Sequence, residues 1–198
     1  LQKVQQIEPE RLLSHFNDPR EAKSPVSFEV RTENDSGEGW LRIVGEPVGE
    51  DFSVTLIDIT NRKRHERKMM ADALSDPLTG VLNRRGFEKE GRACLRNCAS
   101  GAVLYLDLNG FKSINDRFGH QAGDCLLQAV ARRLIDTVRQ SDTVSRLGGD
   151  EFIVCVEQIN TPQDARAAAD KLCDALKQPF QILGTEIETT ASIGIAVY

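Results

Sequence analysis

The chain has 198 residues, of which 28% are charged, and a formal net charge of −5. This acidic balance argues against a nucleic-acid-binding surface, and no apolar stretch approaches the ~20 residues of a membrane-spanning helix. The five cysteines are odd in number and scattered along the chain, which is typical of a protein from a reducing compartment. We therefore expect a cytoplasmic location, although unseen regions of a longer parent protein could still attach it to a membrane.

Residues 1–60 are predicted to form a small β-sheet. Three segments alternate apolar and polar residues as half-buried strands do, at 26–31, 40–44 and 52–57. The third is followed by Asp58-Ile59-Thr60. The segment resembles the C-terminal half of a PAS sensor domain, whose last strand often ends in such a triplet. An unrelated small β-sheet is the alternative interpretation.

Residues 61–74 are predicted to form a helical linker. The basic run within it is more often a solvated helix face than a nucleic-acid patch. Five residues fall at heptad-like spacing, namely Ile59, Arg62, Glu66, Met69 and Ala73. A seam this short does not establish a coiled coil from sequence.

The remainder alternates helices and strands, which implies an α+β sandwich with a central, mainly antiparallel sheet. Helical spacing and capping residues predict three helices, and apolar runs predict a buried strand, a hairpin and a final strand. In chain order these elements are expected at 83–98, 102–107, 121–139, 143–156, 161–177 and 187–197.

The predicted hairpin carries Gly148 and Gly149 at its turn, followed directly by Asp150 and Glu151. A Gly-Gly pair between two apolar runs is typical of a tight turn, and glycine lets a ligand approach the backbone. Two adjacent carboxylates at a turn tip need a positive partner, and a divalent metal carrying a phosphorylated substrate is the candidate.

A third carboxylate, Asp107, ends the predicted buried strand. If this strand lies beside the hairpin, Asp107 and Asp150 converge on one point. A small set of oxygen ligands, completed by substrate phosphates, suits Mg²⁺ or Mn²⁺ better than Zn²⁺.

Five ordered motifs between Ser75 and Tyr198 resemble the GGDEF family, the diguanylate cyclases. They lie at 76–85, 107–116, 118–124, 148–152 and 192–196. The resemblance implies a palm-like, ferredoxin-like nucleotidyl cyclase fold over residues 75–198. It also implies that two facing domains of a homodimer, paired through the linker helix, join two GTP molecules into cyclic di-GMP and release pyrophosphate.

The resemblance also implies the roles of the acids. Two Mg²⁺ or Mn²⁺ ions per active site are expected on Asp107, Asp150 and the carbonyl of Leu108. Asp150 or Glu151 is expected to position or deprotonate the attacking hydroxyl, and the sequence does not decide between them.

For the nucleotide, Asn115 and Asp124 align with the family's guanine-reading pair, and Gly148 and Gly149 with the substrate-contacting turn. His120 aligns with a position near the substrate, or is a helix-entry histidine bonded to a carbonyl. Lys112 is either a phosphate contact or a solvated charge.

Arg139 and Asp142 match the family's inhibitory product site, with Arg146 as a possible helper, and a helix-end capping pair is the alternative. The chain begins at Leu1, so we expect a fragment of a longer protein. The family pattern continues beyond Tyr198 with another helix and a lysine-containing segment that helps hold the triphosphate. We therefore expect this chain to be C-terminally truncated and either to bind GTP poorly or to be inactive, whereas the parent protein would be active. The alternative function is a catalytically silent GGDEF domain that senses GTP or cyclic di-GMP. A cyclase with another product is a third hypothesis, disfavoured by the presence of both guanine-reading residues.

Overall fold

The computed structural model describes residues 26–34, 37–49, 51–97 and 100–198. The chain separates into two compact units, Leu1–Met70 and Ala71–Tyr198. Residues 1–25 of the predicted first domain lie outside the described residues. No helix in the described part of the chain is long and apolar enough to cross a membrane.

The first unit holds a three-stranded antiparallel sheet in the order β1-β2-β3. The strands are β1 (Val26–Asn34), β2 (Gly37–Val48) and β3 (Asp51–Asp58), each longer than the alternating segment that predicted it. Phe28 and Leu56 both pair with Ile43 on β2, which is fully buried. The alternation of apolar and polar residues therefore gives this sheet one apolar face, as period-2 patterning requires.

Helix α2 (Thr60–Leu74) follows the sheet and begins one residue earlier than predicted. Its start is fixed by three hydrogen bonds. Thr60 N donates to Asp58 Oδ1 at 2.9 Å, Trp40 N donates to Thr60 Oγ1 at 2.9 Å, and Ile59 N donates to the Trp40 carbonyl at 2.9 Å. The Asp58–Thr60 triplet is thus the point at which β3 ends and helix α2 begins.

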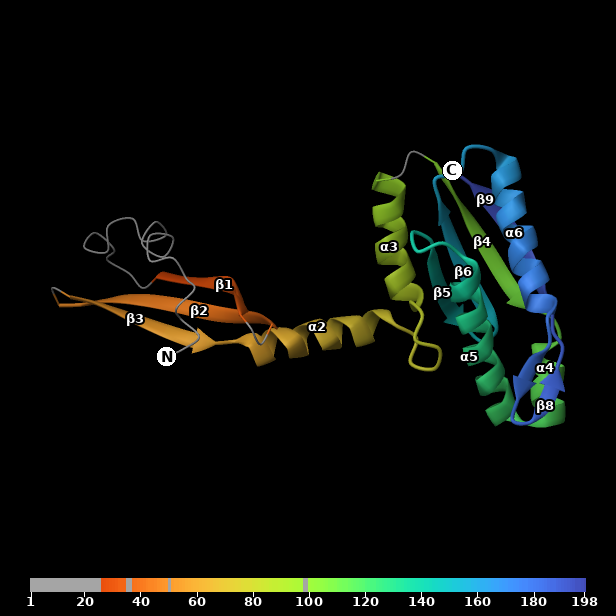
Figure 1. Ribbon diagram of the computed structural model, residues 1–198, viewed down its shortest axis with the longest axis horizontal. Helices are drawn as coiled ribbons and strands as arrows, with labels where there is room; N and C mark the ends of the chain where they lie inside the picture. The colour runs from red at the N-terminus through yellow and green to blue at the C-terminus, as the bar shows by residue number, and fades with distance from the viewer. Residues whose placement is uncertain (1–25, 35–36, 50, 98–99) are drawn as a thin grey trace. The chain divides into compact units, whose positions relative to one another are not determined.

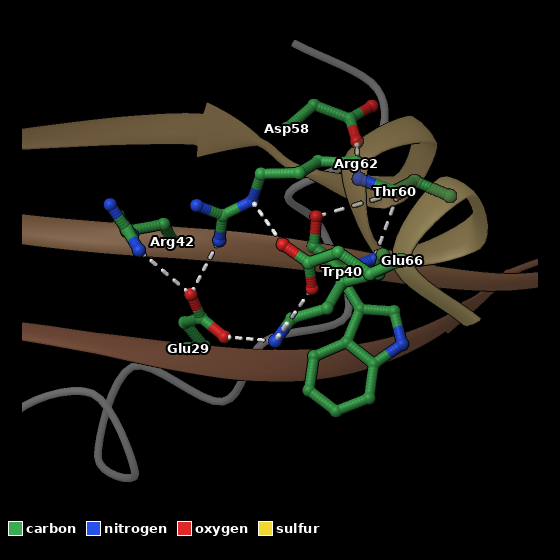
Figure 2. A network of polar contacts seen from close by, with 8 residues as sticks. Glu29, Trp40, Arg42, Asp58, Thr60, Arg62 and Glu66 are labelled. Carbon is green, nitrogen blue, oxygen red and sulfur yellow. Dashed lines mark hydrogen bonds and ion pairs between the residues drawn. The ribbon is translucent and has the colours of Figure 1, made fainter. Parts of the chain in front are cut away.

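The basic run of α2 is tied to acids of the sheet, as Figure 2 shows for Glu29. One Glu29 oxygen accepts from Arg42 at 2.9 Å and from Arg62 at 2.6 Å, and the other pairs with Lys63 at 2.6 Å. The bonds from Lys63 and Arg42, with a smaller one from Arg62, lower the pKa of Glu29 to about 2. Glu29 therefore stays charged through the whole physiological pH range and holds β1, β2 and α2 together.

A second group of contacts between the sheet and α2 lies around the Trp40 indole. Its Nε1 donates to Glu38 at 3.0 Å, and Arg67 pairs with the same carboxylate at 3.1 Å. The Lys63 ammonium and Arg67 guanidinium lie 5.3 and 5.6 Å from the ring centre, within the range of a cation–π interaction. Several cations of the predicted basic face are therefore committed to contacts within the unit.

The second unit is built on a four-stranded sheet in the order β5-β6-β4-β9, with every neighbouring pair antiparallel. The predicted central, mainly antiparallel sheet is confirmed. Its strands are β4 (Gly101–Leu108), β5 (Thr143–Gly148), β6 (Glu151–Glu157) and β9 (Ala191–Val197).

Three long helices flank this sheet: α3 (Arg84–Asn97), α5 (His120–Thr137) and α6 (Pro162–Lys177). Helices α5 and α6 lie side by side against the sheet, and α3 lies beside β5 (Figure 1). The capping predictions are confirmed at two starts. Asn83 Oδ1 accepts from Gly86 N at 3.0 Å, and Thr161 forms a reciprocal capping box with Asp164.

The core lies between the sheet and the pair α5–α6. Leu104 and Leu106 on β4, Leu126 and Leu134 on α5, and Leu172 on α6 are at most 1% exposed. Burial alternates along β4, so the strand turns its other face away from this core. Two of the candidate acids, Asp107 and Glu151, lie on that other face.

Two features were not predicted. Helix α4 (Phe111–Phe118) follows β4, and a hairpin of β7 (Phe180–Ile182) and β8 (Thr185–Ile187) precedes β9. The predicted final strand therefore starts too early, because Ile187 belongs to β8, residues 188–190 are in neither strand, and pairing resumes only at Ala191. Eight and three residues are too few to show a helical or strand period in a sequence.

Candidate active site

The hairpin predicted at the Gly-Gly pair is present between β5 and β6. Gly149 has a φ of 54° and Gly148 a φ of 146°, values that side-chain-bearing residues rarely adopt. A Cβ at either glycine would meet nothing within 4 Å. The turn thus uses glycine both for its backbone conformation and for an open surface that a phosphate can approach.

Arg146 holds this turn from one side. Its Nε and Nη2 donate to the Gly149 carbonyl at 2.9 and 2.7 Å, and its Nη1 pairs with Asp76 Oδ1 at 2.9 Å. Asp76 also accepts from the amide and hydroxyl of Thr79 at 2.9 and 2.6 Å. All three guanidinium nitrogens of Arg146 are therefore engaged, and the loop after α2 is joined to the hairpin tip.

The structure brings the predicted acids together at one end of the sheet. Asp107 on β4 pairs directly with Glu151 on β6, so both side chains lie on the same face. The amide of Leu108 donates to the Asp150 carbonyl at 3.4 Å, which places the turn beside the end of β4. Asp107 is exposed, and Asp150 and Glu151 are partly exposed, so a ligand can reach all three.

The donor set fits a hard divalent cation bound mainly by its substrate. Asp107, Asp150 and the Leu108 carbonyl supply only oxygen atoms, which Mg²⁺ and Mn²⁺ prefer. Within the described ranges, no group of three or more His, Cys, Asp or Glu side chains is arranged to hold a metal by itself. Such a cation would therefore need phosphate oxygens to complete its coordination.

Tyr105 joins the acids and was missed by the sequence reasoning. It lies two residues before Asp107 on the same face of β4 and is 39% exposed. A hydrogen bond to Glu151 raises the pKa of the Tyr105 hydroxyl, and burial and the charges of Glu151 and Asp107 add to the effect. The two-residue period of a strand was the signal that would have revealed it.

The predicted nucleotide contacts lie on α4 and the start of α5, two helices that pack together. Asn115 is on α4 and partly buried, whereas Lys112 on the same helix is exposed. His120 and Asp124 lie in the first turns of α5 and are exposed. Gly110 and Gly119, with φ of 73° and 85°, bound α4 and turn the chain between β4 and α5.

Arg139 and Asp142 lie between α5 and β5. Asp142 accepts from the Arg139 amide at 2.9 Å and from the Glu157 amide at 3.2 Å. The Asp142 side chain therefore shapes this turn, while Arg139 is exposed. Both residues line a cavity of about 350 Å³ between α5, β6 and α6. Arg146 is directed to Asp76 and Gly149 rather than to this pair.

Comparison with known proteins gives one family. The sequence profile described as "Diguanylate cyclase, GGDEF domain" matches residues 73–198. The chain is 42% identical over 148 residues to the bifunctional diguanylate cyclase/cyclic di-GMP phosphodiesterase MucR of Pseudomonas aeruginosa, covering 73% of the chain and 22% of MucR. It is 34% identical to diguanylate cyclase TpbB of the same species, covering 95% of the chain and 46% of TpbB.

The chain thus spans less than half the length of these curated relatives. Among solved structures, the GGDEF domain of TpbB from Pseudomonas aeruginosa is 40% identical with a TM-score of 0.60. That match covers 63% of this chain and 75% of the other.

Proposed function

The chain belongs to the GGDEF domain family, and we propose on this basis that it is an active diguanylate cyclase that condenses two GTP molecules into cyclic di-GMP. The observation that carries the proposal is the acid cluster at the glycine hairpin. Asp107 lies opposite Glu151, and Asp150 stands in the turn beside the end of β4. These are the positions at which the family's metal-binding and catalytic acids are expected.

In the proposed reaction, the 3′-hydroxyl of one bound GTP attacks the α-phosphorus of the GTP held by the facing domain. A phosphodiester P–O bond forms, the bond to pyrophosphate breaks, and the hydroxyl proton passes to the Asp150 or Glu151 carboxylate. The 3′-hydroxyl of the second nucleotide then attacks the α-phosphorus of the first, which releases the second pyrophosphate and closes the ring. Two Mg²⁺ or Mn²⁺ ions per site, held by Asp107, Asp150 and the Leu108 carbonyl, would supply the neutralisation of the phosphate charge.

The other predicted contacts complete the substrate site. Asn115 and Asp124 would pair with the guanine edge. Gly148 and Gly149 offer an open backbone surface to a phosphate. Lys112 and His120 have exposed side chains in the same helical region, which supports a contact of each with a phosphate or ribose.

The first unit would supply regulation. Its three-stranded sheet and the junction at Asp58–Thr60 support a PAS-like sensor fragment. No residue of α2 is buried, and Met69 and Met70 are 60% and 63% exposed. An uncovered helix supports pairing with the same helix of a second copy, which would bring two cyclase domains face to face. The GTP substrate and the free thiols of Cys125 and Cys173 support a cytoplasmic location.

Incubation of the full-length protein with GTP and Mg²⁺ tests the proposal, with the nucleotides identified by chromatography and mass spectrometry. We expect cyclic di-GMP and two pyrophosphates per product. Binding of GTP or cyclic di-GMP without turnover would instead identify the silent sensor module. A protein that converts no GTP and binds neither GTP nor cyclic di-GMP would refute both functions.

We further propose product feedback at Arg139 and Asp142. Arg139 is exposed at the rim of a cavity, and a guanidinium can pair with guanine and with phosphate in a planar, bidentate way. Arg139→Ala should raise the cyclic di-GMP concentration for half-inhibition about tenfold or more, since one charge-assisted contact is worth about 1.5–3 kcal/mol.

Initial rates with added cyclic di-GMP measure this effect, and the rate without product should stay unchanged. Arg132→Ala is the matched control, because Arg132 is an exposed arginine of the adjoining helix that pairs with Asp136. Equal inhibition of wild type and Arg139→Ala would leave Arg139 and Asp142 as a helix-end turn without a ligand.

A further inference from the structure

Gly123 occupies an unexpected place for a glycine. It is buried within the second turn of α5 and has no positive φ that would require the residue. Glycine in a helix costs about 1 kcal/mol relative to alanine. A local cost of this kind is often kept at functional positions, so the space that a Cβ would fill at Gly123 is informative.

That space is taken by the side chain of Asn115. A Cβ at Gly123 would overlap the Asn115 Oδ1 atom and lie 2.9 Å from its Cγ. The next contact, Phe111 Cζ at 3.2 Å, is less severe and belongs to a side chain that can yield. The missing methyl group therefore serves mainly to let the Asn115 carboxamide lie against α5.

The carboxamide is held there by packing. Asn115 Oδ1 is buried and has no hydrogen-bond partner among the described residues. Because the oxygen lies buried against Gly123, we infer that the amide nitrogen is the end of the carboxamide that faces a ligand. An outward donor matches the O6 acceptor of guanine and opposes the amino group that adenine carries at the same place.

We propose that Gly123 is a specificity-determining positioning residue, which fixes the Asn115 carboxamide with its donor outward and thereby sets the preference for guanine over adenine. The inference rests on the proposed function, in which Asn115 and Asp124 contact the base. It adds a residue that touches neither the base nor the metal and acts only through Asn115.

The test is Gly123→Ala in the full-length protein, with GTP and ATP dissociation constants measured by calorimetry and stability by thermal unfolding. We expect GTP affinity to fall about tenfold or more and the GTP-to-ATP preference to approach one. Alanine is more favourable than glycine in a helix, and this gain offsets part of the cost of the clash. A large loss of stability is therefore not expected. Gly91→Ala is the matched control, because a Cβ at this helical glycine would make only an ordinary 3.7 Å contact with Phe87.

A double-variant cycle separates positioning from packing. If Gly123 acts through Asn115, then Asn115→Ala and the double variant Asn115→Ala/Gly123→Ala should bind GTP equally, and the double variant should fold even where Gly123→Ala does not. A double variant that binds GTP more weakly than Asn115→Ala would overturn the inference, as would an unchanged GTP preference in Gly123→Ala. A wild-type protein without preference for GTP would overturn the proposed guanine site itself, and the inference with it.

Discussion

Replacing Asp150 by alanine should abolish cyclic di-GMP formation and leave the fold intact. The side chain stands in the hairpin turn and is partly exposed, and the contact of this turn with β4 is made by the Asp150 backbone carbonyl rather than by the carboxylate. The variant keeps that contact but loses one of the two carboxylates proposed to bind the metal. Loss of one preorganised electrostatic group at a reacting centre typically lowers the rate by about 10²–10³-fold, and loss of a metal ligand should do at least this.

Initial rates over a Mg²⁺ series check the prediction, alongside thermal unfolding without metal. The unfolding temperature should stay equal or rise slightly, because the variant relieves repulsion between adjacent carboxylates. Asp170→Ala is the control, since Asp170 is an exposed acid of α6 that pairs with Arg166. Turnover at the wild-type rate in Asp150→Ala would remove Asp150 from the metal site.

Arg146→Ala should cause the largest loss of stability among these variants, about 2–4 kcal/mol in the free energy of unfolding. The side chains of Arg146 and Asp76 are only 10% and 15% exposed. Without the guanidinium, the Asp76 carboxylate loses its cation and the Gly149 carbonyl loses two donors. Removing one partner of a buried pair costs about 3–5 kcal/mol, and partial exposure of this pair moderates the effect. Urea unfolding measures the difference.

The pH dependence of that difference gives a second check. Burial alone raises the pKa of Asp76, but hydrogen bonds from Thr79 and Arg146 outweigh it and lower the pKa below 3.8. The pair therefore stabilises the fold above the unfolded pKa, and this contribution is lost as pH falls through the lower folded value. The gap between wild type and Arg146→Ala should narrow below about pH 4. Arg166→Ala, which removes an exposed ion pair, should lower the free energy of unfolding by less than about 1 kcal/mol at any pH. An equally small loss in Arg146→Ala would show that the Arg146 contacts do not stabilise the fold.

The glycine hairpin and the buried strand could be predicted because each is encoded locally. The Gly148–Gly149 pair demands a turn, and the continuous apolar run before Asp107 demands a buried strand. The prediction that the end of this strand lies beside the hairpin was also correct. The residue-by-residue pairing of the strands could not be predicted. Asp107 lies opposite Glu151, and the irregular pairing between Arg146 and Gly148 moves Asp150 into the turn.

Contacts between distant residues were beyond sequence reasoning. The Arg146–Asp76 bond joins residues 70 positions apart, and neither residue carries a local pattern that names its partner. In the sequence, Gly123 has no feature that distinguishes it from other helix residues. Only the structure shows that the Asn115 side chain fills the space that a Cβ at Gly123 would take. Short elements such as α4 fail for another reason, since eight residues between two glycines contain little more than two helical turns.

The length of helix α5 sets the distance between two of the proposed binding sites. Asp124 lies near its beginning, Arg139 follows its end, and the helix has 18 residues, so about 20 Å separates the two at 1.5 Å per residue. Its far end is clamped, because Lys171 of α6 donates to the Thr137 carbonyl and Arg133 donates to the carbonyls of Ala175 and Pro179. The nucleotide site proposed at Asp124 and the product site proposed at Arg139 therefore lie near opposite ends of α5 on the same domain. Inhibition through Arg139 should therefore lower the maximal velocity without competing for GTP.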